Sequence, residues 1–229
     1  MKIKGLQKTT LLDFPEKLAC TVFTGGCNFR CPFCHNASLV LRAGEAQEIS
    51  EADFFNYLNK RKEMLDGVCI TGGEPTLCPD LEDFIKKIKE LGLLVKLDTN
   101  GTFPEKIESL LDKGLVDYIA MDIKNSKSKY AVTAGISDFP DAVEKSINII
   151  ISKAPDYEFR TTVVRELHTP QDIAEIAKWI RNSKKYFLQA YVDSGDTIES
   201  GFSAYSAAEM LEILEIAKKE LPVTVLRGI

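Results

Sequence analysis

Residues 25–36 read GGCNFRCPFCHN and place Cys27, Cys31 and Cys34 within eight consecutive positions. This run follows Ala19–Phe23, a β-branched and aromatic segment that we expect to form a strand buried on both faces. The two glycines at the start of the run allow the chain to turn tightly as it leaves that strand. A short loop of this kind folds back on itself, so we expect the three thiols to converge on one site.

Two kinds of metal site and one purely structural arrangement fit this spacing. A cubane iron–sulfur cluster normally takes four cysteines, so three would leave one iron without a protein ligand and free to bind a substrate. A zinc site of the three-cysteine, one-histidine kind could use His35, although His35 is the immediate neighbour of Cys34, whereas paired zinc ligands usually lie a few residues apart. The third interpretation is a group of small buried cysteines, for which three in eight loop positions would be a poor packing choice.

Beyond this loop, β-branched or aromatic segments alternate with helical patterns along the chain. We expect strands at Ala19–Phe23, Val68–Thr71, Leu93–Asp98, Asp117–Lys124, Tyr157–Val164 and Tyr186–Val192, with a short last strand at Val223–Leu226. We expect helices at 50–64, 81–91, 104–113, 140–153, 169–182 and 206–220. Such alternation predicts an α/β fold with parallel pairing, as an open sheet or a full or partial barrel. The functional face then lies at the carboxyl ends of the strands, where the cysteine loop begins.

Length and composition predict one globular domain. The chain has 229 residues, of which 45% are hydrophobic and 28% charged, the ordinary balance of a soluble protein. We expect residues 1–18 to form a short N-terminal extension, with an edge strand or hairpin at 9–14, and residues 19–229 to form the domain. The net charge of -5 argues against a broad surface for nucleic acid or for anionic membranes.

The expected location follows from what the sequence lacks. No apolar run is long enough to cross a bilayer, and the first ten residues lack the apolar core of a secretory signal. We therefore expect a cytoplasmic protein with reduced cysteines, whose tight cysteine group serves metal or redox chemistry. Cys20 and Cys69 are expected as small buried strand residues, whereas Cys78 and His168 are expected in loops.

Polar groups mark the ends of three further strands. Gly72-Gly73-Glu74 combines backbone that a ligand can approach closely with a carboxylate that can meet an ammonium, although a plain strand-to-helix turn gives the same pattern. Asp98, followed by Thr99, ends the third strand, so its carboxylate is expected at the mouth of the sheet. Asp122 and Lys124 alternate onto one side of the fourth strand, where opposite charges must pair with each other or meet a ligand.

Together these features resemble the radical S-adenosylmethionine (SAM) superfamily. The resemblance rests on the C-x3-C-x2-C loop after the first strand, with the aromatic Phe33 just before the third cysteine. Within that superfamily, the run from TTLLDFP at 9–15 to CHN at 34–36 is similar to the activating protein of anaerobic ribonucleoside-triphosphate reductase. That family is related to the activating enzymes of pyruvate formate-lyase, and both groups serve glycyl radical enzymes.

The resemblance implies a partial parallel (β/α)6 barrel that binds a [4Fe–4S] cluster and SAM. Cys27, Cys31 and Cys34 would ligate three irons, and the amino and carboxylate groups of SAM would chelate the fourth. One electron from a low-potential donor such as flavodoxin or ferredoxin would then cleave SAM into methionine and a 5′-deoxyadenosyl radical. That radical would take a hydrogen atom from a glycine of the partner reductase.

The same resemblance assigns roles at the strand ends. Gly72, Gly73 and Glu74 match a motif for the methionine amino group of SAM. Asp98 and Thr99 match a pair that lies beside the cofactor and is also associated with a monovalent cation. The remaining expected contacts are Asp122 and Lys124 at the ribose and carboxylate of SAM, Phe33 at its adenine, and Gln189 where relatives carry a histidine.

The residues alone leave three alternatives. The partner could be another glycyl radical enzyme such as pyruvate formate-lyase, or the substrate could be a small molecule, because the cysteine motif is shared across the superfamily. A zinc-binding interaction module is the alternative of another class, and it predicts a colourless protein that retains zinc.

Overall fold

The computed structural model describes residues 1–45 and 47–229. They form one eight-stranded sheet in which the strands lie side by side in sequence order. β1 runs antiparallel to β2, and all pairs from β2 to β8 are parallel, which confirms the predicted α/β arrangement. The strands are β1 Ile3–Thr10, β2 Ala19–Thr24, β3 Gly67–Gly72, β4 Leu94–Thr99, β5 Tyr118–Asp122, β6 Asp156–Val163, β7 Tyr186–Ala190 and β8 Thr224–Arg227.

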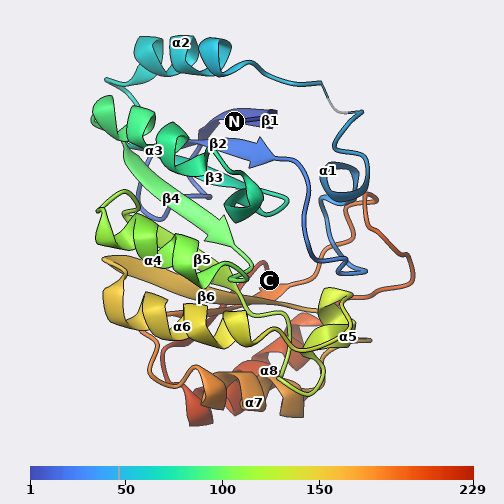
Figure 1. Ribbon diagram of the computed structural model, residues 1–229. Coiled ribbons are helices and arrows are strands. Elements are labelled where there is room, and N and C mark those ends of the chain that lie inside the picture. The colour runs from blue at the N-terminus through green and yellow to red at the C-terminus, as the bar shows by residue number, and fades with distance from the viewer. Residues whose placement is uncertain (46) are drawn as a thin grey trace.

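Most helices lie side by side along the outer face of the curved sheet, as Figure 1 shows. The short α1 and α5 lie instead beyond the strand ends that the arrowheads mark. The hydroxyls of Ser50, Thr169 and Ser206 accept hydrogen bonds from backbone N–H groups in the first turns of α2, α7 and α8, which is how N-caps stabilise helices. The helices are α1 Ala37–Leu41, α2 Glu51–Arg61, α3 Leu81–Glu90, α4 Pro104–Asp112, α5 Tyr130–Ala134, α6 Asp141–Lys153, α7 Pro170–Trp179 and α8 Ala207–Glu220.

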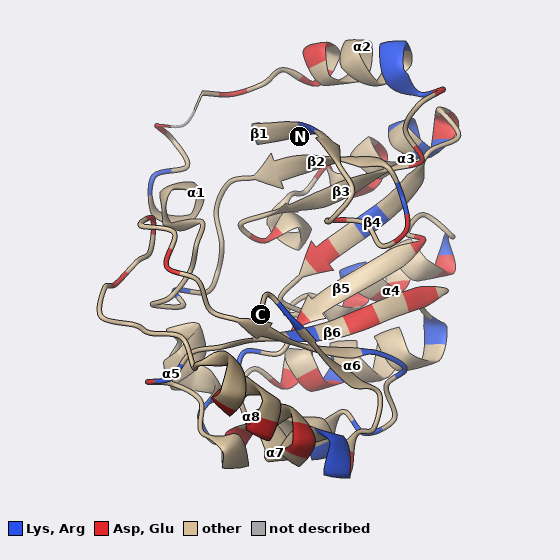
Figure 2. Ribbon diagram, turned by 180° about the vertical axis from the view of Figure 1, so that it is seen from behind, with Lys and Arg blue, Asp and Glu red and all other residues tan. Residues whose placement is uncertain are grey.

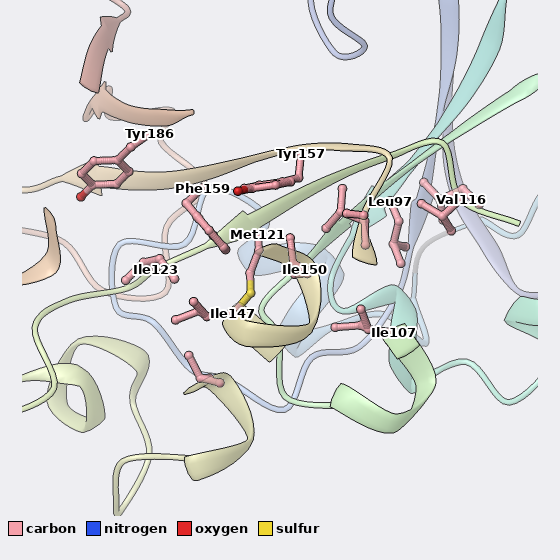
Figure 3. Packing of buried hydrophobic residues seen from close by; sticks show 14 of the residues in the cluster. Leu97, Ile107, Val116, Met121, Ile123, Ile147, Ile150, Tyr157, Phe159 and Tyr186 are labelled. Carbon is pink, nitrogen blue, oxygen red and sulfur yellow. The ribbon is translucent and has the colours of Figure 1, made fainter. Parts of the chain in front are cut away.

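The main hydrophobic core lies between the sheet and the helices. Leu97 of β4, Met121 of β5 and Phe159 of β6 are fully buried and pack toward Ile107 of α4 and Ile150 of α6 (Figure 3). Side chains alternate across a strand, so the residues next to these in sequence face the other side of the sheet.

That other side carries charged groups. Lys96 and Asp98 of β4 and Glu158 and Arg160 of β6 lie close enough to pair with one another. Figure 2 shows charged residues within β4 and β6. The inside of the curved sheet therefore contains a network of ion pairs beside the strand ends.

The segment between β1 and β2 packs at the amino-terminal end of this interior. Phe14 packs with Ala19 and Tyr118 in a small apolar cluster separate from the main core, and its ring centroid lies 6.0 Å from that of Tyr118. The Thr21 hydroxyl donates to Asp13 Oδ2 at 2.6 Å and fixes the segment against β2. The charged interior is thus lined with apolar side chains at the end opposite the cysteine loop.

The structure differs from the prediction in a few short elements. The edge strand covers Ile3–Thr10 and does not extend over 9–14, because the Thr10 hydroxyl accepts hydrogen bonds from the N–H groups of Leu12 and Asp13 and turns the chain. The helices α1 and α5 and a 3-10 turn at Pro75–Leu77 are too short to display a helical period in the sequence. Among the described helices, none has the length and apolarity that a membrane span requires.

Candidate active site

A cavity of about 220 Å³ lies at the carboxyl ends of the parallel strands. Its walls come from the loop after β2 and from the ends of β3 to β7. Asn100, Arg160 and Thr162 also line it and were absent from the predicted set, although strand alternation could have placed Arg160 and Thr162 on one face. All twelve residues predicted from the sequence line this one cavity: Cys27, Cys31, Phe33, Cys34, Gly72, Gly73, Glu74, Asp98, Thr99, Asp122, Lys124 and Gln189.

The cysteine loop is held by backbone hydrogen bonds to distant segments. Gly26 N–H donates to Leu39 O, and Arg30 N–H donates to Ala134 O, both at 2.8 Å. Within the loop, Cys34 N–H donates to Cys31 O at 3.0 Å. Cys31 is buried, whereas Cys27 and Cys34 are half-buried. The thiols therefore sit on a fixed loop and not on a free hairpin.

The glycines of this region are required by contact between two loops. A Cβ at Gly73 would lie 1.9 Å from Gly26 O, and the next residue, Glu74, donates its N–H to that same oxygen at 2.8 Å. A side chain at position 73 would therefore push the β3 loop away from the cysteine loop. The structure gives these glycines a packing reason in addition to the ligand contact that the sequence suggested.

Burial controls the protonation of the free thiols. It raises the pKa of Cys31 to about 12, against the opposing effect of the Lys124 ammonium, and it also raises the pKa of Cys27. Both are therefore neutral thiols near pH 7, and a metal that binds them must displace protons. Among the described residues, no three His, Cys, Asp or Glu side chains already surround a metal-sized point.

The soft sulfur donors fit an iron–sulfur cluster better than they fit a zinc site that uses His35. The His35 ring stacks on Tyr191, with centroids 5.6 Å apart and planes at 24°. This contact holds the imidazole against an aromatic ring, while three thiols face the cavity with no fourth cysteine among its lining residues. Three sulfur donors and one open position are the donor set that a substrate-binding cluster needs.

Arg160 joins the carboxylates of two neighbouring strands. Its Nε donates to Asp122 Oδ1 at 2.9 Å, and its Nη1 lies 3.2 Å from Asp98 Oδ2. Lys124 Nζ donates to the other Asp122 oxygen at 3.0 Å. Burial alone would raise the pKa of Asp122, but the Arg160 and Lys124 charges outweigh it and hold that pKa well below its usual range. The predicted Asp122–Lys124 pair therefore exists, inside a larger network.

Glu74 is 1% exposed, and it links the ends of β3 and β4. It accepts hydrogen bonds from the Thr76 N–H at 3.1 Å, the Thr99 hydroxyl at 2.7 Å and the Asn100 N–H at 2.7 Å. Burial raises the pKa of this carboxyl, against the opposing effect of these donors. Thr99 thus points at Glu74, which the separate motifs in the sequence did not reveal.

The sequence profile of the radical SAM superfamily matches residues 21–180. The chain belongs to the radical SAM superfamily. Membership implies a [4Fe–4S] cluster and SAM, and it confirms this class of partial barrel. The match spans the cysteine loop and the ends of β3 to β6 that line the cavity, and it stops before Gln189 on β7.

Relatives group this radical SAM chain with activating enzymes. A Methanocaldococcus jannaschii protein provisionally named a glycyl-radical enzyme activating enzyme is 32% identical, and the alignment covers 99% of this chain and 96% of that protein. The pyruvate formate-lyase-activating enzyme of Clostridium pasteurianum is 30% identical, with 83% and 82% covered. The chain is therefore a radical SAM activating enzyme.

Solved structures agree on the fold. SuiB of Streptococcus suis, bound to its precursor peptide SuiA, superposes with a TM-score of 0.72 over 91% of this chain and 48% of SuiB, at 18% identity. At this identity the likeness concerns the fold alone, and it supports the partial-barrel description of the sheet.

Proposed function

We propose that this radical SAM enzyme installs a glycyl radical on anaerobic ribonucleoside-triphosphate reductase. The observation that carries the proposal is the meeting of Cys27, Cys31 and Cys34 with the charged ends of three strands in a single cavity. When bound, the cluster and SAM would supply a 5′-deoxyadenosyl radical that takes hydrogen from a glycine. The chain's own part is to bind, orient and shield these groups.

The three cysteines would ligate the cluster, and each would lose its proton on binding. The Lys124 ammonium favours the thiolate form of Cys31, so it assists this loss of protons. The loop that carries the three thiols is hydrogen-bonded to α1 and α5, and three thiolate ligands would leave one coordination position of a four-iron cluster unfilled by protein.

The strand-end groups would orient SAM. Glu74 and the backbone of Gly72 and Gly73 would receive the methionine ammonium, while Lys124 would meet its carboxylate. Asp122 would face the ribose hydroxyls, although two of its interactions already go to Arg160 and Lys124. The expected remaining contacts are Phe33 and Gln189 at the adenine side, with Asp98 and Thr99 behind the methionine end.

A monovalent cation is not part of the proposal. The Asp98 carboxylate already pairs with the Lys96 ammonium and lies 3.2 Å from the Arg160 guanidinium. These two groups supply positive charge where the resemblance places a cation. A third positive charge next to this one buried carboxylate would be desolvated without enough negative charge to balance it.

The chemistry needs proximity more than proton transfer. Hydrogen abstraction by a carbon radical requires the donor glycine to be held against the radical carbon, which is a matter of positioning. The partner glycine would therefore have to enter the mouth of the cavity, and a low-potential flavodoxin or ferredoxin would supply the electron.

The target is tested by electron spin resonance. The reconstituted and reduced protein would be mixed with SAM and with purified anaerobic ribonucleoside-triphosphate reductase, and in parallel with pyruvate formate-lyase. We expect a glycine-centred doublet with the reductase. Active SAM cleavage without a doublet from either partner would exclude glycyl radical transfer to both, and a doublet from the lyase alone would replace the named target.

The cluster itself is tested by anaerobic purification. A brown protein that contains iron and sulfide and bleaches in air is expected. A colourless protein that retains zinc would support the interaction-module alternative instead.

A further inference from the structure

His168 is fully buried in the loop between β6 and α7, and no step of the proposed reaction uses it. Its Nδ1 lies 3.1 Å from the Val164 backbone nitrogen, and its Nε2 lies 2.7 Å from the Lys124 backbone oxygen. The ring therefore joins its own loop to the segment that directly follows β5 and carries Lys124 into the cavity beside Asp122.

These two contacts determine the tautomer of the imidazole. A backbone N–H can only donate, so Nδ1 must be the acceptor for Val164. A backbone carbonyl can only accept, so the proton must be on Nε2 and must point at Lys124 O. The Val164 oxygen, 3.3 Å from Nδ1, receives no hydrogen in this tautomer. A neutral imidazole with its proton on Nε2 satisfies both neighbours at once.

The ring also touches the cysteine loop. The rings of Phe33 and His168 pack in a T-shaped arrangement, with centroids 6.4 Å apart and planes at 79°. Phe33 is 4% exposed. Phe33 lies between two of the cavity-lining cysteines in sequence. His168 thus contacts two separate walls of the cavity, namely the Phe33 side chain and the Lys124 backbone.

Neighbouring bonds leave His168 little freedom. Its own N–H donates to Val164 O at 2.9 Å, and the Tyr205 hydroxyl donates to its backbone oxygen at 2.7 Å. Next to it, Asn125 Nδ2 donates to Leu167 O at 2.9 Å. A ring held on this many sides can fix the position of what it contacts.

We propose that His168 is a positioning residue for SAM binding, which holds Lys124 and Phe33 in place as a neutral imidazole protonated on Nε2. This inference rests on the proposed function only in that Lys124 and Phe33 are taken to contact SAM. The Lys124 side chain carries its ammonium into the cavity, so a backbone shift at Lys124 would displace the charge that meets SAM.

Two amide variants separate the two hydrogen bonds. In His168→Gln the side-chain nitrogen reaches the place of Nε2 and keeps a donor for Lys124 O. In His168→Asn the shorter amide reaches only the place of Nδ1, so it keeps an acceptor for Val164 and loses the bond to Lys124. Both variants remove the ring contact with Phe33, and they differ in which hydrogen bond survives: His168→Gln keeps the bond to Lys124 and loses the bond to Val164, whereas His168→Asn does the reverse.

The first measurement is SAM affinity of the cluster-loaded, unreduced protein by calorimetry, which involves no turnover and no partner. We expect His168→Asn to raise the Kd about tenfold and His168→Gln to raise it about threefold or less. Thermal unfolding of each variant, recorded in parallel, shows that both fold. Equal Kd values for the two variants, or a wild-type Kd in both, would overturn the proposal, since His168 would then only support the fold.

The second measurement is the nitrogen NMR spectrum of histidine-labelled protein, with the His168 signals assigned by their loss in His168→Gln. A protonated Nε2 and an unprotonated Nδ1 near pH 7 are expected, and the opposite tautomer would contradict the inference. Neither measurement depends on glycyl radical formation, so a failure of the proposed partner leaves this test intact.

Discussion

Lys96 and Asp98 face each other on the inner side of β4, where their side chains are 2% and 14% exposed. The Lys96 ammonium pairs with Asp98 Oδ1, and Arg160 approaches the other oxygen of the carboxylate. Burial alone would raise the pKa of Asp98, but the Arg160 and Lys96 charges instead hold it below its usual range. The pair keeps a carboxylate ionised at the wall of the cavity.

Removing the lysine of this pair should destabilise the protein. In Lys96→Met the buried Asp98 carboxylate keeps Arg160 as its charged partner and the weak thiol donor of Cys69, so we expect the free energy of unfolding in urea to fall by about 3 kcal/mol. The exposed Lys86, which pairs with Glu82 on α3, provides a control, and Lys86→Met should change the free energy of unfolding far less than Lys96→Met does. Adding Asp98→Asn to Lys96→Met should recover part of the loss. Similar losses in the two single variants would contradict a special role for the buried pair.

The cysteines can be separated by substitution. Cys31→Ala should remove bound iron and abolish SAM cleavage, because one of the three proposed cluster ligands would be lost. Cys78, a half-buried free cysteine outside the loop, is the matched control, and Cys78→Ala should keep both properties. Iron content after anaerobic reconstitution and the release of 5′-deoxyadenosine measure the outcome. Equal losses in both variants would mean that the ligands are misassigned.

Gly135 at the end of α5 should set the position of the cysteine loop. It has φ of +66°, and a Cβ there would lie 2.2 Å from Arg30 O. Gly114 has a similar φ of +62° with no atom within 4 Å of its Cβ position, so Gly114→Ala tests backbone strain alone. We expect Gly114→Ala to lose about 1 kcal/mol of stability, and Gly135→Ala to lose more and also to retain less iron. The same iron content in both variants would show that the Arg30 contact is unimportant.

Stability should fall as the pH drops below about 6.5, the pKa of an unfolded histidine. Burial lowers the pKa of both histidines in the folded chain, His35 and His168. Below that pH the unfolded state binds more protons than the folded state, so acid favours unfolding until the folded pKa is reached. Urea midpoints between about pH 7.5 and 5 should decline less steeply in His168→Gln. An unchanged slope would mean that His168 is charged or accessible in the folded protein.

The sequence predicted the strands and the residues that line the cavity more closely than it predicted the short elements. Apolar runs in the sequence indicate buried strands, and Asp98 and Asp122 lie at the ends of two such runs. Because the ends of parallel strands meet at one edge of the sheet, residues that line the cavity could be predicted without knowing the distances between them. Arg160 was not among the predicted site residues, because a single arginine in a strand does not indicate which carboxylates it pairs with. Its two carboxylates lie 38 and 62 residues away in the sequence.

His168 shows a second limit of sequence reasoning. A histidine before a helix cap reads as a loop residue, and that description holds. What the sequence lacks is the bond to Lys124 O, 44 residues earlier, which exists only because β5 and β6 are neighbours in the sheet. The sequence likewise does not show why position 135 must be glycine. A side chain there would collide with Arg30 in the cysteine loop, which lies more than a hundred residues earlier.

The cysteine loop depends on parts of the chain that are made much later. Arg30 is bonded to Ala134, Pro32 O accepts the N–H of Glu199 at 2.8 Å, and the Ser38 hydroxyl donates to Asp196 at 2.7 Å. Because synthesis proceeds from the N-terminus, all three cysteines leave the ribosome well before these partners exist. A cluster that requires the loop in this fixed form would therefore be inserted only after these later segments have been made, into a folded chain and not into a nascent one.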